Sequence, residues 1–104
     1  MFNDVSSTVA RTSEGQVVVP QHVVHRRFPT ETVVLNLRTG KYHGLNPTAG
    51  LMLEELAGSG SIAATAARVA AEHGRDVGEV EADLRDLVAA LRDRDLIEIQ
   101  TGQE

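Results

Sequence analysis

A change of hydrophobic period at Asn46-Pro47 limits the folds open to this chain. Before it, β-branched and alternating segments predict three strands, at residues 17–28, 32–37 and 41–45. After it, apolar residues recur at the three- and four-residue spacing of helices. Asn is a favoured N-cap and Pro fits the first helical position, so the first helix should begin here. Strands followed by helices predict an α+β fold.

The strand segments predict an antiparallel meander. Pro20 has no N–H, so segment 17–28 should be an edge strand or contain a bulge there. Arg38-Thr39-Gly40 predicts a short hairpin turn, in which Gly40 supplies the positive φ of a bulge. If the sheet order is sequential, strand 41–45 has one partner and an open edge. Such an edge is a hazard unless shielded, or a docking site for a peptide strand.

Three amphipathic helices should follow and share one core with one face of the sheet. Their predicted end signals are Gly58-Ser59-Gly60, Ser61, Gly74 and the Asp76/Glu79 capping box. Their apolar stripes are Ala49, Met52, Leu53 and Leu56; Ile62, Ala66, Val69, Ala70 and His73; and Val80, Leu84, Leu87, Val88 and Leu91. Residues 96–99 alternate and predict a brief closing strand. A hairpin beside three helices predicts a winged helix-turn-helix.

The length of 104 residues predicts one small domain. Residues 1–16 are polar and predict a flexible arm, residues 17–99 the folded domain, and residues 100–104 a tail. The sequence has no signal-peptide pattern and no apolar stretch near the ~20 residues of a membrane span. We therefore expect a cytoplasmic protein without a membrane partner.

Residue types argue against catalysis. The chain has no cysteine, which excludes disulfides, thiolate metal sites and cysteine nucleophiles. Four histidines are present, but none has other ligand types at metal-binding spacing. No nucleophile elbow or phosphate-binding loop occurs. We expect no metal, no cofactor and no enzymatic activity.

The charge is unevenly distributed. Residues 54–104 hold twelve acidic and five basic side chains, a net charge of −7. The third helix and its flanks, residues 76–95, hold seven acids and three arginines. A winged helix-turn-helix suggests a DNA-binding regulator, in which the third helix would contact the DNA bases. This helix is acidic here and would repel the DNA phosphates. The charge favours basic partners and argues against nucleic acid.

The run VVLNLRTGKYHGLNPT at residues 33–48 resembles the hallmark of PqqD-like proteins, whose hairpin leads into a Leu-Asn-x-Thr step at the first helix. The likeness continues through Leu53-Glu54-Glu55-Leu56, Asp76 and Asp83-Leu84, and spans roughly residues 17–99. Two positions depart from the family: Val77 stands where proline often opens the third helix, and Asp95 where glycine often ends it. Both departures concern helix ends.

The resemblance implies a recognition element for RiPPs, the ribosomally synthesised and post-translationally modified peptides. Such a protein binds the leader segment of a precursor peptide and is not itself an enzyme. The leader would add as an antiparallel strand to the third strand and lie against the third helix. The implied main-chain partners are Lys41, Tyr42, His43, Gly44 and Leu45, and the implied helix wall is Val80, Asp83, Leu84 and Leu87. Sequence does not divide the wall residues between groove and core.

Two pathways are consistent with the resemblance. The polar arm and the Leu-Asn-Pro-Thr step favour a lasso-peptide recognition protein, whose maturation partner would be a cysteine-protease-like leader peptidase. The alternative is the peptide chaperone of pyrroloquinoline quinone biosynthesis, whose partner would be a radical S-adenosylmethionine enzyme. We expect a monomer, with an edge-paired dimer as the alternative.

Overall fold

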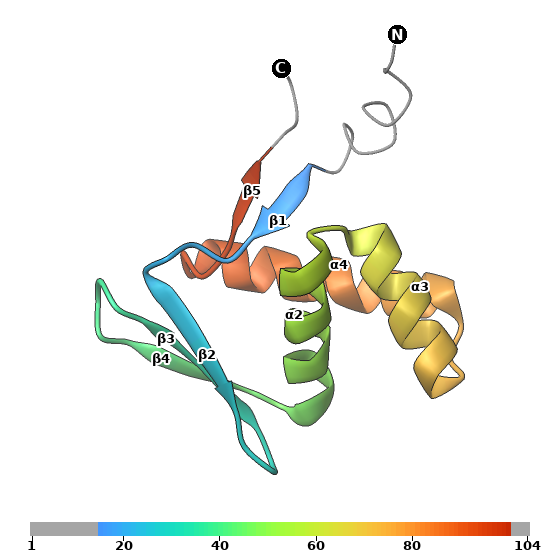
Figure 1. Cartoon of the computed structure of the whole chain (residues 1–104), viewed down its shortest axis with the longest axis horizontal. Coiled ribbons are helices and arrows are strands. Elements are labelled where there is room, and N and C mark those ends of the chain that lie inside the picture. The colour runs from blue at the N-terminus through green and yellow to red at the C-terminus, as the bar shows by residue number, and fades with distance from the viewer. Residues whose placement is uncertain (1–14, 101–104) are drawn as a thin grey trace, which may run out of the picture.

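The computed structural model describes residues 15–100, in which a three-stranded sheet lies to one side of three helices and a separate pair of strands lies at the top of the view (Figure 1). The elements in chain order are β1 (Gln16–Val18), β2 (Val23–Arg27), β3 (Thr32–Asn36), β4 (Tyr42–Leu45), α2 (Pro47–Ser59), α3 (Ile62–His73), α4 (Val77–Asp93) and β5 (Glu98–Gln100). The predicted α+β class, the three-stranded sheet and the three helices after it are confirmed, but four strands, not three, precede the helices. The predicted start of the first helix at Asn46-Pro47 is confirmed as well.

The main sheet is an antiparallel meander in the order β2-β3-β4, as predicted. In the centre of the sheet, Val34 of β3 lies opposite His25 of β2 and His43 of β4. Alternate side chains of β2 and β3 are buried on one face, which we call the inner face: Val23, Thr32, Val34 and Asn36. This face packs against the helices and forms one wall of the core.

The prediction of one strand over residues 17–28 is wrong. The chain turns after Pro20, whose carbonyl accepts a hydrogen bond from Val23 N at 3.0 Å, so the segment divides into β1 and β2. β1 leaves the meander and pairs with β5, with Val17 opposite Ile99. Gln16 and Gln100 belong to this pair, so regular structure extends one residue beyond each expected boundary. Otherwise, the expected arm and tail lie outside the described residues.

The predicted helix ends are confirmed. The side chains of Asn46, Ser61 and Asp76 accept hydrogen bonds from main-chain N–H groups three residues on, at 2.8, 3.1 and 3.1 Å. Gly60 and Gly74 end α2 and α3 in the left-handed region, at φ 72° and 64°. Each helix therefore begins at a local signal that needs no tertiary contact, and α2 and α3 also end at one.

The core joins the three helices, β5 and the inner face of the sheet. The fully buried large side chains include Leu53 and Leu56 of α2, Leu84 and Leu91 of α4, and Leu96 before β5. His73 was expected on the apolar stripe of the second helix but is exposed at the end of α3. Within residues 15–100, no helix is long and apolar enough to cross a membrane.

Gly50 determines how closely α2 approaches the sheet. A Cβ at this position would overlap Thr32 Oγ1 and lie 2.7 Å from Thr32 Cβ. Thr32 is itself fully buried in β3, and its hydroxyl has no hydrogen-bond partner among the described residues. A side chain at position 50 would therefore push α2 away from β3.

We predict that Gly50→Ala lowers the free energy of unfolding by about 1–3 kcal/mol, because overpacking outweighs the gain in helix propensity. Urea denaturation measures the change. Gly58→Ala in the same helix is the matched control, since nothing lies within 4 Å of its Cβ position. We expect that control to stabilise the domain by up to about 1 kcal/mol. Equal effects of the two substitutions would contradict the close contact.

Candidate peptide-binding site

β4 is an edge strand with hydrogen-bonded neighbours on one side only. Asn36 N donates to Lys41 O at 2.9 Å, and antiparallel pairing alternates from that point. His43 and Leu45 therefore bond to β3, whereas the N–H and C=O groups of Tyr42 and Gly44 point to the open edge. No described residue forms a main-chain hydrogen bond there. The edge thus offers two donors and two acceptors to an added strand.

The side chains of β4 alternate between the two faces of the sheet. His43 and Leu45 lie on the inner face and are half-buried, and Leu45 packs against the core. Tyr42 lies on the opposite face and is 72% exposed. A Cβ at Gly44 would lie 2.7 Å from Glu31 Oε1, so the Glu31 side chain extends across this position. A larger residue at position 44 would have to displace the end of the Glu31 side chain.

The turn before β4 is fixed by Asn36, which sequence analysis did not single out. Its Oδ1 accepts hydrogen bonds from Arg38 N at 2.9 Å and Thr39 N at 3.3 Å. Gly40 N donates to Asn36 O, and Gly40 has φ 75°, as predicted for a bulge. Asn at the first position of a turn that contains Gly is a recognised signal, so the motif itself indicated this role.

Asn36 also links the sheet to the end of α4. Its Nδ2 donates to the main-chain oxygen of Asp95 at 3.5 Å, and His22 Nε2 lies 3.4 Å from the same oxygen. Asp95 has φ 60°, a left-handed conformation that glycine adopts without steric penalty. This conformation gives a physical reason for the glycine frequent at this position in PqqD-like proteins. The link holds the end of α4 against the sheet.

The structure divides the four residues predicted for the helix wall. Val80 and Leu84 are 0% exposed and belong to the core, so they form no part of the accessible surface. Asp83 is exposed and forms an ion pair with Arg75 at 2.8 Å. Leu87 is half-buried and packs on the same core as Leu45 of β4. Asp83 and Leu87 are four residues apart and share one face of α4, which is the part of the predicted wall open to a ligand.

A family model and two solved structures match this chain. Residues 31–97, which span most of the described domain, match the family model "Coenzyme PQQ synthesis protein D (PqqD)". The chain belongs to the PqqD family. It is a PqqD-like RiPP recognition element, as the hairpin motif predicted. No curated protein matches the sequence.

Two solved structures resemble this PqqD-family chain. One is TbiB1 in complex with the TbiA(beta) leader peptide, at 30% identity and a TM-score of 0.70, covering 83% of this chain and 96% of that one. The other is lasso peptide synthetase B1 complexed with the leader peptide, at 24% identity and a TM-score of 0.71. That match covers 80% of this chain and 98% of the other, and shows the same fold.

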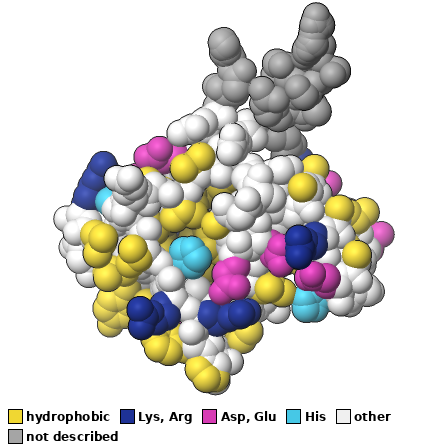
Figure 2. All heavy atoms as spheres, viewed as in Figure 1, with side chains coloured by type: hydrophobic (Ala, Val, Ile, Leu, Met, Phe, Trp, Pro, Cys, Tyr) yellow, Lys and Arg dark blue, Asp and Glu magenta, His cyan; other side chains and the backbone are white. Residues whose placement is uncertain are grey.

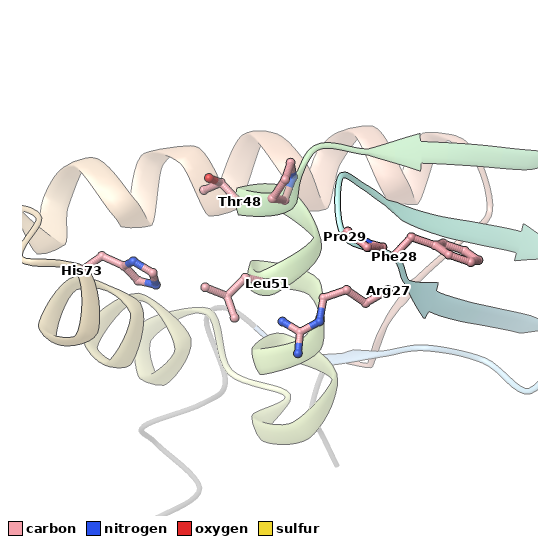
Figure 3. A pocket seen from close by; sticks show the side chains of 7 residues that line it. Arg27, Phe28, Pro29, Thr48, Leu51 and His73 are labelled. Atoms are coloured by element: carbon pink, nitrogen blue, oxygen red, sulfur yellow. The ribbon is translucent and has the colours of Figure 1, made fainter.

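A cavity of about 570 Å³ lies away from the predicted site of this PqqD-family domain (Figure 3). Its walls come from the end of β2 and the following turn, from the first turns of α2, and from the end of α3. The side chains include Arg27, Phe28, Pro29, Thr48, Leu51 and His73. None of the lining residues belongs to β4 or α4. β2 is the other edge of the sheet, so this cavity adjoins a second open edge.

We predict that Asn36→Ala lowers the free energy of unfolding by about 1–3 kcal/mol, since a buried side chain loses its bonds to the turn and to Asp95. Thr39→Ala is the control, because Thr39 Oγ1 accepts only an exposed bond from Lys41 N at 3.1 Å. Thermal and urea denaturation would compare the two variants. A loss at position 36 no larger than that at position 39 would contradict the linking role.

Proposed function

We propose that this chain binds the leader segment of a ribosomally made precursor peptide by adding the leader as an antiparallel strand to β4. The observation that carries the proposal is the open edge of β4, where Tyr42 and Gly44 present unpaired main-chain groups. Both similar solved structures hold a leader peptide, and the TbiB1 chain is 30% identical over nearly its whole length. The domain would act as a winged helix-turn-helix that reads peptide in place of DNA.

Main-chain pairing alone does not account for selective binding. The two N–H and two C=O groups at the edge of β4 allow at most four hydrogen bonds, each worth about 0.5–1.5 kcal/mol net. A micromolar dissociation constant requires about 8 kcal/mol. Side-chain contacts with His43, Leu45 and Leu87 therefore supply the rest, and with it the choice between peptides.

The charge of α4 favours a basic leader. Residues 76–95 carry a net charge of −4, and Asp83 is the acid nearest to Leu87 on their shared face. Arg75 neutralises part of this charge through its ion pair with Asp83. A lysine or arginine of the leader would compete with Arg75 for the same carboxylate. Electrostatic attraction of this kind speeds encounter more than it tightens the complex.

The bound leader would then be presented to a maturation enzyme. Since both similar structures hold leader peptides, and one is named lasso peptide synthetase B1, we favour a lasso-peptide leader peptidase over a radical S-adenosylmethionine enzyme. The recognition element performs no chemistry in this scheme. Its contribution is to fix the leader, so that the attached core peptide reaches the enzyme at high effective concentration.

We predict that Tyr42→Pro raises the dissociation constant for a synthetic leader peptide of the same biosynthetic system at least tenfold. Proline removes an outward N–H and places its ring at the open edge, while the bonds from β4 to β3 stay intact. Isothermal titration or fluorescence anisotropy gives the constant.

His25→Pro is the matched control on the other edge strand. By the same alternation, the His25 N–H points away from β3, towards the edge that adjoins the cavity of Figure 3. We expect this variant to bind the leader with unchanged affinity. Unchanged binding by Tyr42→Pro, together with weakened binding by His25→Pro, would move the leader to β2 and overturn the assignment to β4.

A further inference from the structure

One acidic side chain lies against the edge strand β4. Residues 16–45 contain a single acid, Glu31, which directly precedes β3. Its Oε1 lies 2.7 Å from the position that a Cβ of Gly44 would occupy, so the carboxylate contacts β4 at Gly44. Hydrophobic side chains gather along the sheet side of the molecule with Lys and Arg beside them, whereas most acidic side chains in this view lie over the helices (Figure 2). Glu31 is therefore the one acid that the main sheet itself offers to a ligand at this edge.

The carboxylate lies on the face of the main sheet opposite the inner face, which we call the outer face. Gly44 stands between His43 and Leu45, whose side chains are on the inner face, so a Cβ at position 44 would point outwards. Tyr42 shares this orientation two residues earlier and is 72% exposed. Gly44, in contrast, has no side chain to separate the Glu31 carboxylate from the open edge. The outer side of the edge thus combines an acid with an exposed aromatic ring.

The Glu31 carboxylate has no partner of its own. No described residue forms an ion pair or a side-chain hydrogen bond with it. Arg27 and Arg38 lie within 4.0 Å of acids outside the main sheet. Arg26 is on the outer face but belongs to β2, about 10 Å from β4, and Lys41 lies before the other end of β4. The carboxylate is therefore available to a cation from a ligand.

Strand addition to β4 determines which leader residue would meet this carboxylate. Gly44 directs both of its main-chain groups to the open edge, so it would form a hydrogen-bonded pair with the leader residue directly opposite. In such a pair both side chains lie on one face, with Cβ atoms about 4.5–5.5 Å apart. The leader residue opposite Gly44 would therefore point to the outer face. Its Cβ would lie within about 8 Å of Glu31 Oε1, a distance that long side chains reach.

We propose that Glu31 is a specificity-determining residue, which selects lysine or arginine at the leader position opposite Gly44. The inference rests on the proposed function, because it assumes that the leader forms a strand on β4. A leader cation at this position would meet the carboxylate without an intervening side chain, and the ring of Tyr42 lies diagonally beside it for a cation–π contact. A leader acid would be repelled. The neighbouring leader residue, opposite His43, would point to the inner face, so this determinant is separate from the acids of α4.

Charge reversal at position 31 tests the inference. The probe is a synthetic leader peptide of the same biosynthetic system, in variants that carry lysine or glutamate at each position in turn. Fluorescence anisotropy at low salt gives the dissociation constants for the full recognition protein. At one position, we expect the wild type to bind the lysine variant about two- to tenfold more tightly than the glutamate variant, as for an exposed ion pair replaced by a repulsion. Glu31→Lys should reverse that preference at the same position, and high salt should weaken both preferences.

Glu98→Lys is the matched control. It makes the same charge change at an exposed position of β5, which belongs to the other sheet. We expect this variant to keep the wild-type preference at every leader position. Positions 31 and 98 are both exposed, so both variants should fold, and circular dichroism checks this.

The remaining outcomes separate this inference from the proposed function. Leader binding in which Glu31→Lys keeps the wild-type preference at every position would refute the role of Glu31 and leave strand addition standing. Equal effects of Glu31→Lys and Glu98→Lys would refute it as well, because net charge alone would then explain the preference. A wild-type protein that binds none of the leader variants would overturn the proposed function and this inference together.

Discussion

The side chain of Asn36 holds the β3–β4 turn and, through it, the register of β4. Its oxygen caps the turn at Arg38 and Thr39, and its main-chain N–H starts the ladder at Lys41. A slip of one residue would exchange the two faces of β4 and turn the main-chain groups of Tyr42 and Gly44 towards β3. Both the open edge and the side chains beside it therefore depend on this turn. The Asn36 side chain also donates a hydrogen bond to Asp95, so one residue contacts both the turn and the end of α4.

The fold places an open strand edge and an amphipathic helix around one core. Leu45 of β4 and Leu87 of α4 are both half-buried at the margin of that core, and each leaves part of its surface accessible. Under the proposed function, a leader strand on β4 would gain main-chain bonds from the edge and apolar contact from these margins. Residues 76–95, which contain α4, carry a net charge of −4, whereas residues 23–45 hold four basic side chains and one acid. The acidic charge of α4 would favour the approach of a basic leader under the proposed function.

Local signals made much of this structure predictable. The caps at Asn46, Ser61 and Asp76 depend on neighbours in sequence, and so do the helix ends at Gly60 and Gly74. The edge position of β4 followed from a short turn and a sequential meander. The PqqD resemblance rested on this hairpin, and the family match confirms it.

Features set by distant contacts were not predictable. The pairing of β1 with β5 joins opposite ends of the domain, and no local pattern specifies it. The stripe of α4 has one spacing throughout, so sequence could not show that Leu84 is core while Leu87 reaches the surface. That division depends on how α4 packs against α3 and the sheet. The ion pair between Arg75 and Asp83 spans the α3–α4 turn and likewise required the structure.

Amide hydrogen exchange, followed by NMR with and without a synthetic leader peptide, tests strand addition to β4 most directly. The N–H groups of Tyr42 and Gly44 point to the open edge and should exchange rapidly in the free protein. Bound leader should protect both strongly, while the outward N–H groups of His25 and Arg27 on β2 keep their exchange rates. Leader binding that leaves Tyr42 and Gly44 unprotected, or that protects His25 and Arg27 instead, would contradict the account.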